Sequence, residues 1–182
     1  MIEITSLDHN GRGIGKIYNK ICFVENSLPT EIVEPRIIKE KKNYIEAEVG
    51  KYIKKADNRI ESPCPYFDKC GGCDLLHINY KDSLNFKQEK IQNICNKYLN
   101  KKIQLNKIIE CDYNFYYRNK VTFHVKEKIG FYKNKTYDLI SINSCMIGDK
   151  LINKSIEKLN KLNLKNINKI VCRTANNKLM IY

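Results

Sequence analysis

The cysteines are the residues of this chain best suited to chemistry. Three of them lie within ten residues, in the run CPYFDKCGGC, where Cys64, Cys70 and Cys73 have the spacing C-x5-C-x2-C. Gly71 and Gly72 allow the backbone to adopt positive φ and to wrap closely around an inorganic centre. Thiolates are soft ligands that select zinc or an iron–sulfur cluster. A chain without secretory features uses cysteines more often for metals than for disulfides, so the run predicts a metal site.

A fourth ligand is needed, because both zinc and a four-iron four-sulfur cluster take four protein ligands here. His77, four residues after Cys73, would complete a Cys3His zinc site. One of the other cysteines would complete an iron–sulfur site. The spacing alone leaves the two alternatives open.

Composition places the chain among globular proteins. It has 182 residues, of which 42% are hydrophobic and 29% charged, so it lies outside the disordered, collagen-like and disulfide-rich classes. The longest apolar runs, residues 21–24 and 179–182, are far too short for a membrane span. The N-terminus carries an acidic residue and no hydrophobic signal region. We therefore expect a cytoplasmic protein, a monomer with no membrane partner.

The charge is strongly positive, with 33 Lys and Arg against 20 Asp and Glu and a net charge of +13. Only five of the basic residues are Arg, and the abundance of Lys, Asn and Ile is also what an A- and T-rich genome would impose. The distribution is more informative, since residues 1–63 have a net charge of +1 and residues 64–182 of +12. This excess predicts a polyanionic partner, with nucleic acid ahead of a membrane surface. The alternative is a solvated Lys-rich surface with no partner.

Residues 1–57 read as five short strands, among them 2–5, 20–24, 31–38 and 44–53, with a Gly-rich turn over residues 8–15. Strands at this spacing predict a small closed β-barrel of the OB type. Two prolines around Cys64 then forbid regular structure and mark a boundary. We expect one domain over residues 1–60 and a second over 61–182.

The second part mixes helices and strands. Apolar residues at helical spacing predict a long helix over about residues 80–100, and Asp149 can cap a shorter helix that extends to Leu162. Strands are expected at 117–125, 129–132, 138–142, 170–173 and 178–182, the last two joined by a hairpin turn at residues 175–177. The expected fold class is α+β, a five-stranded barrel followed by a mixed α/β module that contains the cysteine loop.

Several segments, in the right order, resemble the RNA (uracil-5-)-methyltransferases, which make 5-methyluridine in ribosomal or transfer RNA. Residues 7–13 (LDHNGRG) and 23–29 (FVENSLP) look like the leading TRAM domain of that family, a small RNA-binding barrel. Residues 62–73 look like its cluster loop, and residues 117–123 (YRNKVTF) like the first strand of its central domain. The resemblance extends over nearly the whole chain.

The resemblance implies a four-iron four-sulfur cluster on Cys64, Cys70, Cys73 and Cys145, and it makes His77 a packed residue. Four ligands leave no open iron for a substrate, so the cluster is expected to be structural. The other four cysteines, which sit among apolar neighbours, are expected to be core residues: Cys22, Cys95, Cys111 and Cys172.

In the family, the nucleophile, the general base and the pocket for S-adenosylmethionine lie in a C-terminal Rossmann-like domain. We expect that domain to be absent from this chain, which would use S-adenosylmethionine only as part of the full-length enzyme. Residues 11–16 (GRGIGK) do not match a phosphate-binding loop. No catalytic residue is predicted here.

The predicted task is to hold RNA, ribosomal RNA ahead of transfer RNA. In the barrel, Arg12 and Lys16 are expected to contact phosphates, because barrels of this kind hold single strands in a basic groove with stacking aromatics. In the second module, aromatic and cationic groups interleave, so Tyr117, Arg118 and Lys120 are expected to contact RNA as well. The alternatives are a core position for Tyr117 and a structural salt bridge for Arg118. Two other interpretations remain, a free-standing TRAM and iron–sulfur RNA-binding protein without catalysis, and a zinc-stabilised binding module.

Overall fold

The computed structural model describes all 182 residues and divides them into two compact units. Unit 1 consists of residues 1–63 and 74–109, and unit 2 of residues 64–73 and 110–182. The cysteine loop therefore belongs to unit 2, although the segments on both sides of it belong to unit 1. The chain has no helix that combines the length and the apolar content needed to cross a bilayer.

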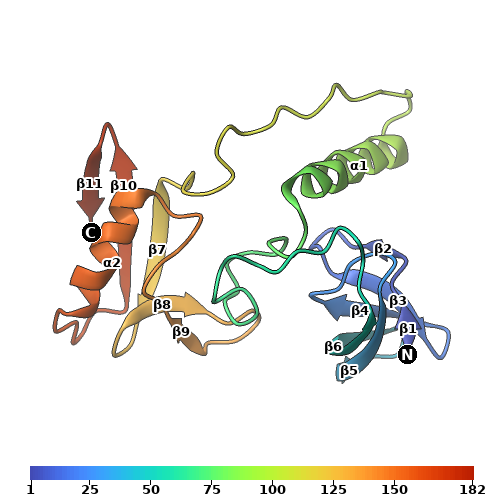
Figure 1. Cartoon of the computed structure of the whole chain (residues 1–182), viewed down its shortest axis with the longest axis horizontal. Helices are drawn as coiled ribbons and strands as arrows, with labels where there is room; N and C mark the ends of the chain where they lie inside the picture. The colour runs from blue at the N-terminus through green and yellow to red at the C-terminus, as the bar shows by residue number, and fades with distance from the viewer. The chain divides into compact units, whose positions relative to one another are not determined.

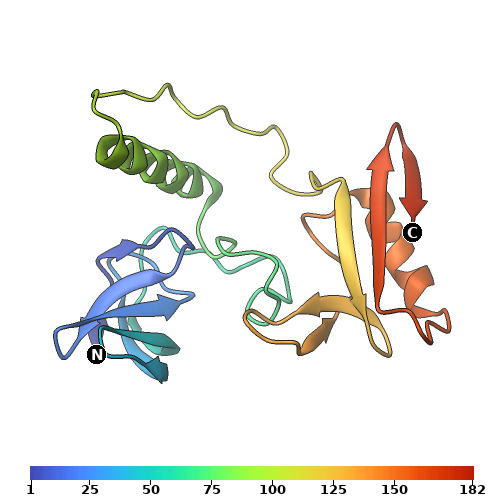
Figure 2. The ribbon, with the colours of Figure 1, turned by 180° about the vertical axis from the view of Figure 1, so that it is seen from behind.

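Unit 1 is built on a six-stranded sheet in the order β1-β5-β6-β4-β3-β2 (Figures 1 and 2). Only β4 and β6 pair in parallel. The first strand also contacts β3, so the sheet curls towards itself. Its strands are β1 (Ile2–Glu3), β2 (Ser6–Leu7), β3 (Gly13–Ile17), β4 (Lys20–Glu25), β5 (Ile32–Glu40) and β6 (Tyr44–Lys54).

The number of strands differs from the expected five. The single strand expected at residues 2–5 is two short ones, because Ile4 turns into the core and the chain changes partner from β5 to β3 after it. The second half of the expected Gly-rich turn is strand β3, in which Gly13 and Gly15 let neighbouring side chains and backbone approach closely. The TRAM-like region is therefore β-rich as predicted, with six strands in place of five.

The core of the curled sheet contains alternate residues of its strands. Six side chains, almost wholly buried, form it: Ile4, Cys22, Val24, Val33, Ile45 and Ala47. Helix α1 (Tyr80–Tyr98) follows in the same unit and is capped by Asn79, whose side chain accepts a hydrogen bond from the Asp82 backbone N–H. Leu84 on this helix is buried, whereas Ile91, Ile94 and Tyr98 are exposed.

Unit 2 is a five-stranded antiparallel sheet in the order β11-β10-β7-β8-β9, with helix α2 packed against it. Alternate residues of β7 and β10 face α2 and bury Phe123, Ile170 and Cys172 with Ile152 and Ile156 of the helix. Its elements are β7 (Lys120–Val125), β8 (Ile129–Tyr132), β9 (Leu139–Ser141), α2 (Lys150–Asn160), β10 (Lys169–Ala175) and β11 (Lys178–Ile181).

Most elements of unit 2 lie where the sequence predicts them. Asp149 caps α2 by accepting a hydrogen bond from the Leu151 N–H at 2.7 Å. Asn176 and Asn177 form the hairpin turn with φ of 49° and 56°, as a two-residue turn of type I′ requires. The two units divide the chain at other positions than the expected boundary at residue 60, since residues 61–63 and 74–109, which include α1, cluster with the first unit.

Candidate functional site

The four predicted cluster ligands all lie in unit 2. Cys64, Cys70 and Cys73 lie on the loop of residues 64–73, and Cys145 on the segment between β9 and α2. Burial, followed by the charges of Cys145, Cys70 and Cys64, raises the pKa of the Cys73 thiol to about 12. Burial also raises the pKa of Cys70, with Cys145 and Cys64 adding to it. Electrostatic interactions between thiol groups weaken with distance, so the four thiols lie near one another.

The thiols nevertheless do not meet at a single point. No group of three or more His, Cys, Asp or Glu side chains is arranged to hold one metal ion. A tetrahedral zinc ion with Zn–S bonds of about 2.3 Å would draw its sulfurs to within about 4 Å of one another. An iron–sulfur cluster gives each cysteine its own iron and keeps the sulfurs farther apart. The choice between zinc and an iron–sulfur cluster stays a prediction. All eight cysteines are free thiols.

The glycines of the cysteine loop act through close approach. Neither Gly71 nor Gly72 has the positive φ that the sequence predicted, since Gly11 is the one glycine that has it. A Cβ on Gly71 would lie 2.9 Å from the Asn134 backbone nitrogen and 3.0 Å from the Tyr132 carbonyl oxygen. The Gly71 N–H donates to that same oxygen at 3.0 Å. Gly71 thus allows the loop to lie directly against the end of β8.

Asn153 of α2 fixes the segment that carries Cys145. Its Oδ1 accepts from the Cys145 N–H at 2.7 Å, and its Nδ2 donates to the carbonyl oxygens of Cys145 at 2.9 Å and Gly148 at 2.7 Å. Tyr66 accepts from the Asn143 N–H at 3.0 Å and so ties the cysteine loop to the same segment. The sequence analysis missed both residues. An Asn in the first turns of a helix, where it is a weak helix former, was the available signal.

His77 has the surroundings of a packed residue. It is 2% exposed, and burial followed by the positive charge of Arg59 lowers its pKa to about 4. Glu31 and a backbone hydrogen bond with Ser27 oppose that shift. The groups that act on it all belong to unit 1, whereas the candidate cysteines belong to unit 2. These surroundings favour the packed role that the resemblance implies.

A buried ion pair adjoins His77. Glu31 is fully buried, and its carboxylate accepts from Arg59 Nη2 at 2.9 Å and from the backbone N–H groups of Leu28 at 2.8 Å and Ala56 at 3.2 Å. Burial raises the pKa of Glu31, but the hydrogen bonds from Arg59 and the two backbone groups outweigh it and keep the pKa below its usual range. This pair fastens the segment that leaves β6 to the curled sheet.

Of the two predicted RNA contacts in unit 1, Arg12 is already engaged. Its guanidinium pairs with Asp8 at 2.8 Å and Glu46 at 3.4 Å and lies 4.5 Å from the centre of the Phe23 ring. A phosphate would have to compete with two carboxylates for it. Lys16 is exposed on β3.

The three predicted contacts in unit 2 remain accessible. Tyr117 is 57% exposed, and Arg118 and Lys120 are exposed as well. The backbone of Arg118 bonds to the segment after Cys145, through its N–H to Ile147 and its carbonyl to Asp149. Its positive charge lowers the pKa of Cys73, against the larger effect of burial. Arg118 therefore lies close enough to the Cys73 thiol to act on it electrostatically.

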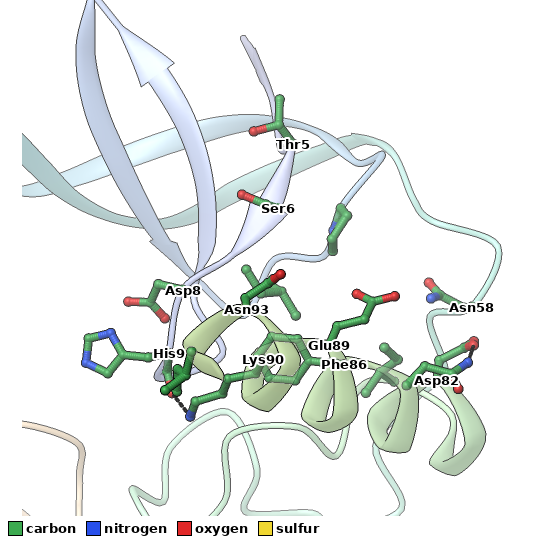
Figure 3. A pocket seen from close by; sticks show the side chains of 15 residues that line it. Thr5, Ser6, Asp8, His9, Asn58, Asp82, Phe86, Glu89, Lys90 and Asn93 are labelled. Carbon is green, nitrogen blue, oxygen red and sulfur yellow. Dashed lines mark hydrogen bonds between the residues drawn. The ribbon is translucent and has the colours of Figure 1, made fainter. Parts of the chain in front are cut away.

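Unit 1 also contains a cavity of about 610 Å³ between residues 5–9 and α1 (Figure 3). Asp8, Asp82 and Glu89 line it, and Lys90 is the only Lys or Arg among its lining residues. Lys90 Nζ donates to the His9 carbonyl oxygen at 2.6 Å (Figure 3). A lining with three carboxylates disfavours a phosphate ligand, so this cavity is a poor candidate for RNA.

The remaining cysteines follow the prediction in part. Cys22 and Cys172 are buried in the two cores, and burial raises the pKa of Cys22 to about 11. Cys95 is half-buried. Cys111, expected in a core, is exposed instead, because the segment around it forms no helix or strand.

Comparison with known proteins identifies the family of the N-terminal domain. Residues 1–49 match the TRAM domains. The chain carries a TRAM domain. It is also 36% identical, over 96% of its length, to an uncharacterized RNA methyltransferase of Clostridium tetani, and 33% identical over 88% of its length to the 23S rRNA (uracil(1939)-C(5))-methyltransferase RlmD of Neisseria lactamica.

The chain spans about two fifths of these relatives, 42% of the first and 37% of the second. Among solved structures, it matches the tRNA (uracil-54, C5)-methyltransferase of Pyrococcus abyssi, crystallised with S-adenosyl-L-homocysteine, with a TM-score of 0.71. That match covers 100% of this chain and 45% of the other at 23% identity, so it establishes a shared fold. The resemblance to part of an RNA (uracil-5-)-methyltransferase is thereby confirmed.

Proposed function

We propose that this chain is the RNA-recognition and cluster-binding part of a uracil-5-methyltransferase that acts on 23S ribosomal RNA. Transfer RNA is the second candidate substrate, because the solved structure of similar fold is named for transfer RNA. Ribosomal RNA is favoured since a named relative at 33% identity acts on it. A protein with this function would be located in the cytoplasm.

The observation that carries the proposal is the shared neighbourhood of four thiols from two separate segments. Cys64, Cys70 and Cys73 would bind a four-iron four-sulfur cluster together with Cys145, and the charge of Arg118 would lie beside it. When bound, the cluster would cross-link the loop to the sheet and leave no iron open to substrate. Asn153 and Tyr66 would hold the Cys145 segment in position to receive it.

The test is metal analysis of the chain purified without oxygen. We expect about four iron and four sulfide atoms per chain and a brown solution. Cys145→Ser should lose most of this iron, whereas Cys111→Ser, which removes an exposed thiol outside the site, should retain it. Stoichiometric zinc in place of iron would favour the alternative hypothesis, a zinc-stabilised binding module, over the iron–sulfur cluster. Equal iron in both variants would remove Cys145 from the ligand set.

Methyl transfer itself is proposed for the longer protein. The reaction needs a cysteine nucleophile, a general base and bound S-adenosylmethionine, and no residue described above is assigned to any of these roles. The second candidate function is a free-standing RNA-binding protein with the same cluster. A gene that continues in frame beyond Tyr182 into a methyltransferase domain would exclude it.

A further inference from the structure

The five-stranded sheet of unit 2 has one face that no helix of the unit covers. Helix α2 packs against strands β8, β10 and β11 on the other face (Figures 1 and 2). Because strand residues alternate between faces, the positions between the buried ones share the uncovered side. We call this surface the open face, and its members are Lys120, Thr122, His124, Gly130, Tyr132, Leu139, Ser141, Lys169, Val171, Arg173, Ala175, Lys178, Met180 and Tyr182.

The open face is positively charged without compensation from its own sheet. None of the five strands contains an Asp or a Glu. Lys120 lies directly opposite Arg173 in the neighbouring strand, and Lys169 lies opposite the ring of His124. The like charges of Lys120 and Arg173 at opposed positions destabilise the sheet. This arrangement becomes favourable once an anion binds across the strands.

Aromatic rings lie beside these cations. The His124 ring stacks on Tyr132 with centroids 4.0 Å apart and planes 25° from parallel. Tyr137 meets the edge of Tyr132 at 5.6 Å and is itself 83% exposed. Tyr182 is 61% exposed. The π-face of a nucleobase can stack on rings of this kind without regard to sequence.

We propose that the open face binds a single-stranded segment of RNA. Its bases stack on the cluster of Tyr137, Tyr132 and His124, and its phosphates bind Lys169, Arg173 and Lys120. A β-sheet that presents aromatics to bases and cations to the backbone is an established way to hold single strands. This inference rests on the proposed function, which requires RNA binding but assigns it to no surface beyond Tyr117–Lys120 and the TRAM domain.

The chemistry of the face favours RNA over a protein domain. A folded domain packed here would have to desolvate Lys120, Lys169 and Arg173, which costs free energy unless each is paired. The phosphates of a flexible strand can supply those partners while the strand stays solvated. The aliphatic side chains of the face are Leu139, Val171, Ala175 and Met180, and Met180 lies directly opposite Arg173 in the neighbouring strand.

The test is a binding titration of the full 182-residue chain with a labelled single-stranded oligouridylate of about 12 nucleotides. The double variant Lys169→Ala/Arg173→Ala should weaken binding by about tenfold or more. The slope of log affinity against log salt should become shallower by about 1.4, because each phosphate contact on a single strand contributes about 0.7. Both residues are exposed, so the fold should survive.

A matched control removes the same charge from the opposite side of the sheet. Lys154 and Lys158 are exposed on α2, and Lys154→Ala/Lys158→Ala should change affinity less than about twofold. Equal weakening by the two double variants would overturn the proposal, because binding would then follow net charge alone. If the wild-type chain binds no RNA at about 0.1 M salt, the proposed function itself fails.

A single substitution tests the stacking. Tyr137→Ala should weaken binding about fivefold or more, and Tyr137→Phe, which keeps the ring, should restore it. Unchanged affinity in Tyr137→Ala would remove this ring from the site. If a duplex of the same length bound more tightly than the single strand, the proposal for the open face would be overturned, because paired bases cannot stack on its rings.

Discussion

The two units are stabilised by different kinds of polar interaction. Unit 1 has 18 basic and 13 acidic residues and buries an ion pair, Glu31 with Arg59, beside the neutral His77. Unit 2 has 15 basic and only 7 acidic residues, gathers four thiols, and holds their loops with Asn153 and Tyr66. In unit 1, carboxylates such as Glu31 and Asp8 pair with the arginines of the same unit. Unit 2 has fewer carboxylates, which leaves its cations available to a polyanion.

The largest expected effect is the loss of the ion pair in unit 1. Arg59→Ala leaves the fully buried Glu31 carboxylate without its cation, and removing one partner of a buried pair costs about 3–5 kcal/mol. Urea unfolding followed by circular dichroism should show unit 1 melting earlier while unit 2 keeps its transition. The exposed cation Arg36 provides the control, since its side chain is 74% exposed and Arg36→Ala should cost little. Equal loss in both variants would contradict the comparison.

The next effect is a pH dependence confined to unit 1. The pKa of His77 falls from about 6.5 when unfolded to about 4 when folded, so the unfolded chain binds more protons between these values. Stability should therefore fall as the pH drops from about 6.5 towards 4, by up to about 3 kcal/mol. Glu31, whose folded pKa is lowered, adds a loss only in the more acidic range.

Thermal melts from pH 7 to pH 4.5 would measure this dependence. His77→Gln removes the titrating ring, so its melting temperature should change less with pH than that of the wild type. His124, half-buried on unit 2 and stacked on Tyr132, provides the matched control, because His124→Gln leaves the environment of His77 intact. An identical pH profile for wild type and His77→Gln would show that other groups set the dependence.

The two units also differ in how far the sequence reveals them. Alternation and turn residues predict the bounds of β8 and the presence of α2 with its Asp149 cap, because these signals are local. The split of the first strand and the grouping of α1 with unit 1 depend on contacts between distant segments, which periodicity does not encode. The cysteine spacing identifies the loop, whereas Cys145 follows only from the resemblance. The sequence predicts Arg12 as an RNA contact but does not reveal its two carboxylate partners, because folding brings them to it.

The smallest expected effect tests how Asn153 of unit 2 holds the segment that carries Cys145. Asn153→Ala leaves the Cys145 N–H and the carbonyl groups of Cys145 and Gly148 without their side-chain partner, at a cost of about 1–3 kcal/mol. The loss should lie in the unit 2 transition of a urea melt and should lower the iron retained by the anaerobic protein. Lys154→Ala, one residue along the same helix and exposed, should change neither. If Asn153→Ala lowered stability but left the iron unchanged, Asn153 would support the helix cap and not the position of Cys145. Iron loss that exceeds the loss of stability would identify it as a positioning residue for the thiol site.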